Sequence, residues 1–140
     1  MKYYIASDEK NIKQVKSLIK KLNAKGFSCV NEWNLFDKNG NKETTNSLGD
    51  YEKEGIDEAD FMLIFLTAGK GNLYELGHAL SSNKKIVVYS PEKENYHINK
   101  KSIFHNIPGA IICSGTLYKL VKLIQSLAPA EQDDPSPMNS

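Results

Sequence analysis

Arginine is absent from this chain of 140 residues, and all 18 of its basic residues are lysine. Because arginine is the usual bidentate partner of phosphate and carboxylate groups, its absence disfavours a site that needs tight phosphate recognition. The net charge is only +1, so the composition predicts no nucleic-acid polymer or other polyanion as a partner. No apolar run approaches the length of a membrane span, which predicts a chain without a membrane partner.

Cysteine is also scarce, and the spacing of Cys29 and Cys113 matches no zinc or redox motif. Both lie in apolar stretches, which is typical of reduced core thiols in a cytoplasmic protein. The N-terminal segment 1–6 is too short for the apolar part of a signal peptide and has the pattern of a strand. His97 and His105 show no metal-ligand spacing, so the sequence predicts no metal site.

Short apolar runs alternate with segments of helical periodicity along the chain. The longest apolar run, Phe61 to Leu66, is continuous rather than alternating, which indicates a strand buried on both faces of a parallel sheet. Glycines at positions 49 and 55 are expected to weaken the helix before it. The predicted strands cover residues 3–6, 27–30, 61–66, 85–89 and 110–113, and the predicted helices follow Asp8, span 48–59, begin near Asn72 and span 117–127.

This alternation predicts a single α/β domain over residues 1–127. We expect a doubly wound, flavodoxin- or Rossmann-like fold with a parallel five-stranded sheet and helices on both faces. Residues 128–140 are rich in proline and acidic side chains and are predicted to form a disordered tail. The long polar segment 31–45 is a candidate functional loop.

Glu75 is the strongest candidate for a functional side chain. It follows the buried strand 61–66 and a glycine turn, near the start of the helix that begins at Asn72. That position lies at the carboxyl edge of a central strand, where open α/β sheets bind their ligands. The same spacing also fits a capping box, in which Glu75 would serve only the first turn of its helix. The spacing alone does not decide between a catalytic and a capping carboxylate.

Three segments together resemble the nucleoside 2-deoxyribosyltransferase superfamily, which also includes the 2′-deoxynucleoside 5′-phosphate N-hydrolases. The first is Tyr4-Ile5-Ala6, on the first strand. The second is Glu58-Ala59-Asp60-Phe61, which leads into the buried strand. The third runs from Gly71 to Ala79 and contains the pattern Glu-Leu-Gly-x-Ala.

The resemblance implies that Glu75 is a nucleophile. It would attack the anomeric carbon, release the base and leave a glycosyl-enzyme ester, which water or a second base then resolves. It also implies that Tyr4 orients this glutamate and that Glu52 is the second carboxylate, where the family typically has aspartate. The family builds its pockets at a dimer interface without a metal or organic cofactor, so a homodimer without cofactor is expected.

Other positions are candidates for contacts with a nucleoside or nucleotide substrate. Trp33 is expected to stack on the base or to cover the core, and Gly71 and Asn72 lie near the expected sugar position. Ser7 begins the first loop, which is rich in glycine, serine and arginine in the phosphate-specific members. Here the two acidic residues that follow Ser7 should repel a 5′-phosphate, which favours a nucleoside.

Two alternatives remain open from the sequence. One is an NAD-cleaving domain of the TIR type, which also uses a glutamate on a flavodoxin-like sheet. The other is a non-catalytic module that senses nucleosides or nucleotides. Gly69 favours this second alternative, since transferases of the family usually carry an aspartate there. His78, one helical turn after Glu75, fits either a packing role or a proton donor.

Overall fold

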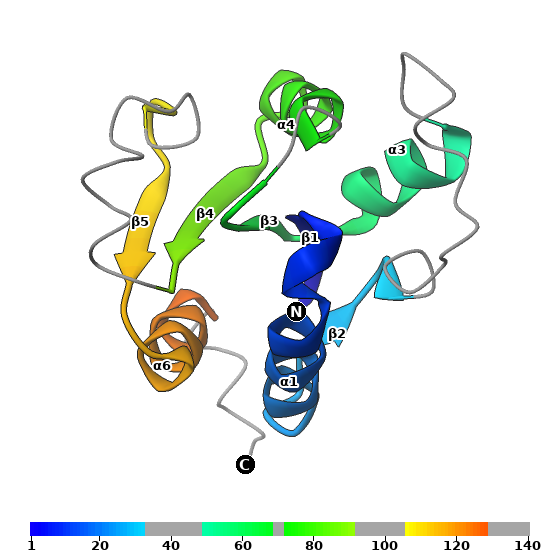
Figure 1. Cartoon of the computed structure of the whole chain (residues 1–140). Helices are drawn as coiled ribbons and strands as arrows, with labels where there is room; N and C mark the ends of the chain where they lie inside the picture. Colours follow the sequence, from blue (N-terminus) through cyan, green and yellow to red (C-terminus); the bar gives the residue numbers. More distant parts are fainter. Residues whose placement is uncertain (33–48, 69–71, 92–105, 129–140) are drawn as a thin grey trace, which may run out of the picture.

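The structure is a computed structural model that describes residues 1–32, 49–68, 72–91 and 106–128. It confirms the predicted α/β class, because five parallel strands form one sheet in the order β2-β1-β3-β4-β5 (Figure 1). The chain reverses its direction of progress across the sheet between β1 and β3, and such a switch point is where sheets of this type bind ligands. The strands are β1 (Lys2–Ser7), β2 (Ser28–Cys29), β3 (Phe61–Phe65), β4 (Lys85–Ser90) and β5 (Ile111–Ser114).

Helices cover both faces of the sheet. In Figure 1, α1 and α6 lie below the strands, and α3 and α4 lie above them. The buried side chains form two separate apolar clusters, one on each face. The helices are α1 (Ile12–Asn23), α3 (Asp50–Glu58), α4 (Asn72–Ser81) and α6 (Leu117–Leu127), and a short 3-10 turn, η1 (Glu9–Asn11), precedes α1.

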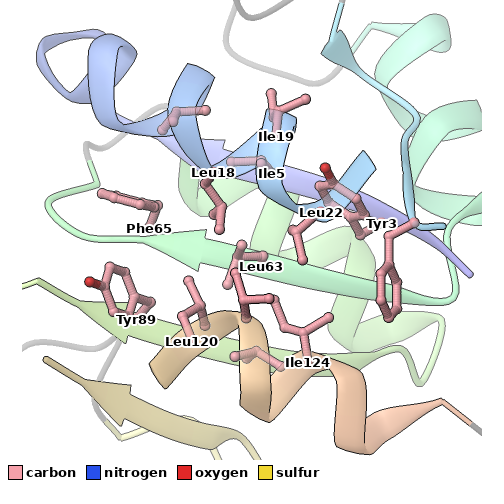
Figure 2. Close-up of a cluster of buried hydrophobic side chains, with 14 of the residues drawn as sticks. Tyr3, Ile5, Leu18, Ile19, Leu22, Leu63, Phe65, Tyr89, Leu120 and Ile124 are labelled. Atoms are coloured by element: carbon pink, nitrogen blue, oxygen red, sulfur yellow. The ribbon is translucent and has the colours of Figure 1, made fainter. Parts of the chain in front are cut away.

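The face covered by α1 and α6 is closed by apolar side chains. Leu18 and Leu22 of α1 pack there with Leu120 and Ile124 of α6, as Figure 2 shows. Their spacing is the helical periodicity that the sequence shows. The strands contribute alternate residues to this cluster because successive side chains of a strand point to opposite faces. These strand residues are Tyr3, Ile5, Phe61, Leu63, Phe65, Val87, Tyr89 and Cys113.

The face covered by α3 and α4 receives the other half of the strand residues. Ile56 of α3 and Leu76 of α4 pack against them. Because β3 contributes to both clusters, its sequence is apolar at every position rather than at every second one. The strand residues on this face are Tyr4, Ala6, Met62, Ile64, Ile86 and Val88.

One strand is shorter than the sequence predicts, and two glycines have specific places around α3. The predicted second strand, 27–30, is reduced to Ser28–Cys29. The two glycines of the predicted second helix have defined places, whereas their expected effect on helix stability stays a prediction. Gly49 is the residue that precedes α3 as its N-cap, and Gly55 faces Tyr4 so closely that a Cβ atom there would lie 3.3 Å from the tyrosine ring. Gly55 therefore lets α3 approach the sheet at Tyr4.

Both cysteines carry free thiols, and Cys113 is buried in the apolar core. Within the described segments, no helix combines the length and the apolar character needed to cross a lipid bilayer. Of the predicted tail, only Ala128 falls inside the described residues, directly after α6 ends at Leu127. Trp33 and Gly71 lie outside the described residues.

Candidate active site

Glu75 is a buried carboxylate on the first turn of α4, with only 5% of its surface exposed. The Tyr4 hydroxyl donates a hydrogen bond of 2.5 Å to Oε2, and the Asn72 side-chain amide donates one of 2.7 Å to Oε1. Burial of a carboxylate is unfavourable unless its oxygens are hydrogen-bonded. Each oxygen of Glu75 therefore has a neutral donor, and the carboxylate is held in one orientation.

Tyr4 reaches Glu75 from the middle of β1, where it pairs in register with Met62 of β3. Its side chain is fully buried. Burial is the main reason why the pKa of the Tyr4 hydroxyl is raised well above its usual value, and the charge and hydrogen bond of Glu75 raise it further. The hydroxyl is therefore protonated at neutral pH and acts as a donor to Glu75.

Asn72 is the first residue of α4, three positions before Glu75. On a helix, side chains three residues apart are neighbours on one face, which explains why the amide reaches the carboxylate. The sequence placed Asn72 either at the sugar or at the start of the helix. The structure shows a third contact, since its Nδ2 atom holds Glu75.

Glu52 lies on α3, close to the same pair. Its Oε1 atom accepts a hydrogen bond of 2.9 Å from the backbone N–H of Gly49, which stabilises the start of the helix. Glu52 is three residues before Gly55, on the helix face that approaches Tyr4. The charge of Glu52 adds to the rise of the Tyr4 pKa, so this second carboxylate lies within electrostatic range of the Tyr4 hydroxyl.

Asn31 belongs to the same site although the sequence did not single it out; it is 2% exposed and follows the short strand β2. Its Oδ1 atom accepts from the Ile5 N–H at 3.0 Å, and its Nδ2 atom donates to the Ile5 carbonyl at 2.8 Å. Asn31 also lowers the pKa of the Tyr4 hydroxyl, against the effect of burial. The signal in the sequence was only a polar amide directly after an apolar run.

Ser7 ends β1 at the carboxyl edge of the sheet, and its hydroxyl is engaged within its own loop. It accepts from Asn11 Nδ2 at 3.0 Å and donates to the carbonyl of Asp8 at 3.3 Å. Asn11 also donates to the carbonyl of Thr67, after β3, and so ties the loop to the neighbouring strand. The carboxylate of Asp8 accepts from the Lys10 N–H at 3.1 Å and caps η1.

His78 joins the two helices that carry the carboxylates. Its Nε2 atom lies 2.8 Å from Oδ1 of Asp57 on α3. Lys84, which follows α4, donates to the carbonyls of Asp57 and Ala59 at the end of α3. Of the two roles that the sequence left open for His78, this contact matches packing between α3 and α4.

These side chains offer a fixed, buried carboxylate, a protonated phenol bonded to it and a second carboxylate beside the phenol. This combination suits nucleophilic attack at a carbon that develops positive charge, because a carboxylate can trap such a centre as an ester. Across the described part of the chain, no group of three histidine, cysteine, aspartate or glutamate side chains could hold a metal ion.

Comparisons with known proteins agree with the fold and with the sequence motifs. The sequence profile of the nucleoside 2-deoxyribosyltransferase family matches residues 3–126. The solved structure of the CMP N-glycosidase BcmB from Clostridium botulinum resembles this fold with a TM-score of 0.58 and 20% sequence identity, over 91% of this chain and 100% of that chain. A search of the curated proteins finds no match to the chain.

Proposed function

Because the chain belongs to the nucleoside 2-deoxyribosyltransferase family, we propose that it cleaves or transfers the N-glycosidic bond of a nucleoside or nucleotide. Glu75 is the nucleophile. The observation that carries this proposal is the burial of Glu75 together with the hydrogen bond from Tyr4, 71 residues away in the chain. A glutamate that only capped its helix would not need a buried tyrosine from a central strand.

The reaction proceeds in two steps. A carboxylate oxygen of Glu75 bonds to C1′ of the sugar while the bond from C1′ to the base nitrogen breaks, and the base leaves with the electron pair and takes up a proton. Water or an N–H nitrogen of a second base then attacks C1′, gives its proton to the auxiliary carboxylate and releases Glu75, with net retention of configuration. Tyr4 and Asn72 orient the carboxylate, and Glu52 is the proposed auxiliary carboxylate that moves the proton.

We further propose that a neutral nucleoside is preferred over its 5′-phosphate. The loop after β1 uses Ser7 within its own hydrogen bonds, and the carboxylate of Asp8 occupies the N-terminus of η1. A negative side chain there repels a phosphate. The CMP N-glycosidase, by its name, acts on a nucleotide, so the assay has to contain both forms.

Base release, separated by chromatography, is the test. The protein is incubated with deoxynucleosides, their 5′-monophosphates, ribonucleosides and NAD, beside Glu75→Gln. We expect the variant to lose about 10⁴-fold or more in turnover, because it removes the nucleophile. Glu58→Gln is the matched control: Glu58 pairs with Lys2 on the exposed surface, so this variant should keep full turnover.

The outcomes separate the three candidate functions. Unchanged turnover in a folded Glu75→Gln variant would contradict the proposed nucleophile. Release of nicotinamide from NAD alone would indicate the TIR-type activity. Binding of a nucleoside without turnover of any substrate would identify a sensing module.

The homodimer is also a proposal that follows from the family. The surface that would form it is the exposed side of α3 and α4, where large apolar side chains face outward. These outward-facing side chains are Tyr51, Leu73, Tyr74 and Leu80. Sedimentation of the pure protein measures the oligomeric state.

A further inference from the structure

The edge strand β2 is shorter than the strand beside it. The register pairs Lys2 with Ser28 and Tyr3 with Cys29, and β2 then ends, whereas β1 continues to Ser7. The next backbone groups of β1 on this side belong to Ile5, and the side chain of Asn31 bonds both of them. A side-chain amide has the same donor and acceptor as a peptide group. Asn31 thus replaces one residue of the missing strand.

This bond pair fixes the backbone next to Tyr4, the residue whose hydroxyl bonds Glu75. The Oδ1 atom of Asn31 also accepts from the thiol of Cys29 at 3.3 Å, so the amide is held on both sides. Its Nδ2 atom has two hydrogens, and the Ile5 carbonyl takes one of them. Asn31 lowers the pKa of the Tyr4 hydroxyl, which is the direction expected for an amide hydrogen near the phenol oxygen.

The two bonds from Asn31 to Ile5 fix the backbone directly after Tyr4, and so they limit the directions from which the phenol can reach Glu75. We propose that Asn31 is a positioning residue of the active site, whose amide holds β1 next to Tyr4 so that the phenol proton points at Glu75. The proposal rests on the proposed function and assigns Asn31 a role in the glycosidic reaction.

The test combines a readout of the Glu75 carboxyl group with a readout of turnover. NMR of ¹³C-labelled glutamate follows the titration of Glu75, and base release gives kcat/KM against pH. In Asn31→Ala we expect the Glu75 titration midpoint to rise, because the ionised carboxylate loses part of its hydrogen bond. We expect kcat/KM to fall about tenfold to a hundredfold, with the acidic limb of its pH profile moved to higher pH.

Phe27→Leu is the matched control. Phe27 lies beside the same short strand but packs into the cluster under α1 and α6, on the opposite face of the sheet. This variant should lower the unfolding temperature and leave the Glu75 midpoint and the pH profile as in the wild type. Asn31→Ser keeps a small polar side chain at this position and supplies the same measurements if the alanine variant does not fold.

A Glu75 midpoint equal to that of the wild type in the folded Asn31 variant would overturn the proposal, whatever the turnover. A midpoint that moves equally in Phe27→Leu would also overturn it, because loosening of the sheet edge would then explain the change. If the wild type releases no base while the midpoint moves only in the Asn31 variants, the proposed function fails and the link from Asn31 through Tyr4 to Glu75 stands.

Discussion

Tyr3 and Tyr4 are neighbours on β1, are both fully buried and face opposite sides of the sheet. Tyr3 stacks on Phe61 with 5.8 Å between the ring centres, and its hydroxyl has no hydrogen-bond partner in the described part of the protein. Tyr4 donates its hydroxyl proton to Glu75. One tyrosine therefore serves as an apolar side chain, while the hydroxyl of the other organises a charged group.

The two faces of the sheet differ in the same way. The cluster under α1 and α6 contains only apolar residues, aromatic residues and one cysteine. On the opposite face, Glu75 interrupts the apolar packing, although an apolar residue of similar size would avoid burial of a charge. Natural proteins lose stability at functional sites in this manner, so the contrast supports the proposed active site on the side of α3 and α4.

Removing each hydroxyl in turn is the strongest test of this contrast. We expect Tyr4→Phe to lower base release about a hundredfold, because Glu75 loses the donor that orients it. Tyr3→Phe should leave turnover unchanged and raise stability by about 1 kcal/mol, since it removes an unpaired buried hydroxyl. Assays of base release and urea unfolding measure both effects. Equal losses of turnover in the two variants would remove the distinction between the faces.

A methyl group added at two glycines tests the packing around the site. Gly55→Ala would place a Cβ atom 3.3 Å from the Tyr4 ring, so we expect the ring to shift and turnover to fall about tenfold. Gly77→Ala on α4 is the control, because no atom lies within 4 Å of a Cβ there. It should stabilise the protein by about 0.5–1 kcal/mol through helix propensity alone. Turnover maintained in Gly55→Ala would show that the Tyr4 ring tolerates displacement.

Unfolding at alkaline pH tests how residues that pack in the cluster under α1 and α6 contribute to stability. Burial raises the pKa of Cys29 from 9.0 to about 12 and that of Tyr89 from 10.0 to about 12. Their neutral forms stabilise the fold fully below pH 9 and pH 10 respectively, and this contribution is lost as the pH rises through 12. Urea midpoints should therefore fall above pH 9, and less steeply in Cys29→Ala. An equal slope in that variant would assign the alkaline loss to other groups.

The sequence predicted the fold well because its signals are local. The apolar run at 61–66 needs burial on both faces, and only a central parallel strand provides it. The position of Glu75 followed from this strand and the glycine turn after it. The family resemblance paired Glu75 with Tyr4, and a hydrogen bond joins the two in the structure, whereas their catalytic roles stay predictions.

The remaining parts of the site depend on contacts between distant segments, which no local pattern encodes. Asn31 acquires its partners only because β2 ends at Cys29 and leaves the groups of Ile5 unpaired. Gly55 has low helix propensity. Its contribution, which is the close approach of α3 to the Tyr4 ring, becomes visible only in the folded structure. Asn31 and Gly55 both shape the surroundings of Tyr4, and these surroundings form only when distant segments pack together in the folded chain.

At this edge of the sheet, the Asn31 side chain pairs with β1 in place of a strand, and this has a consequence for solubility. Unpaired backbone groups along the edge of a sheet are a template on which a second chain can add a strand, and this is a common beginning of aggregation. At Ile5 the amide of Asn31 already occupies both the N–H and the carbonyl. A foreign strand therefore finds no free pair of groups at Ile5, and a single buried asparagine blocks strand addition at this point of the edge.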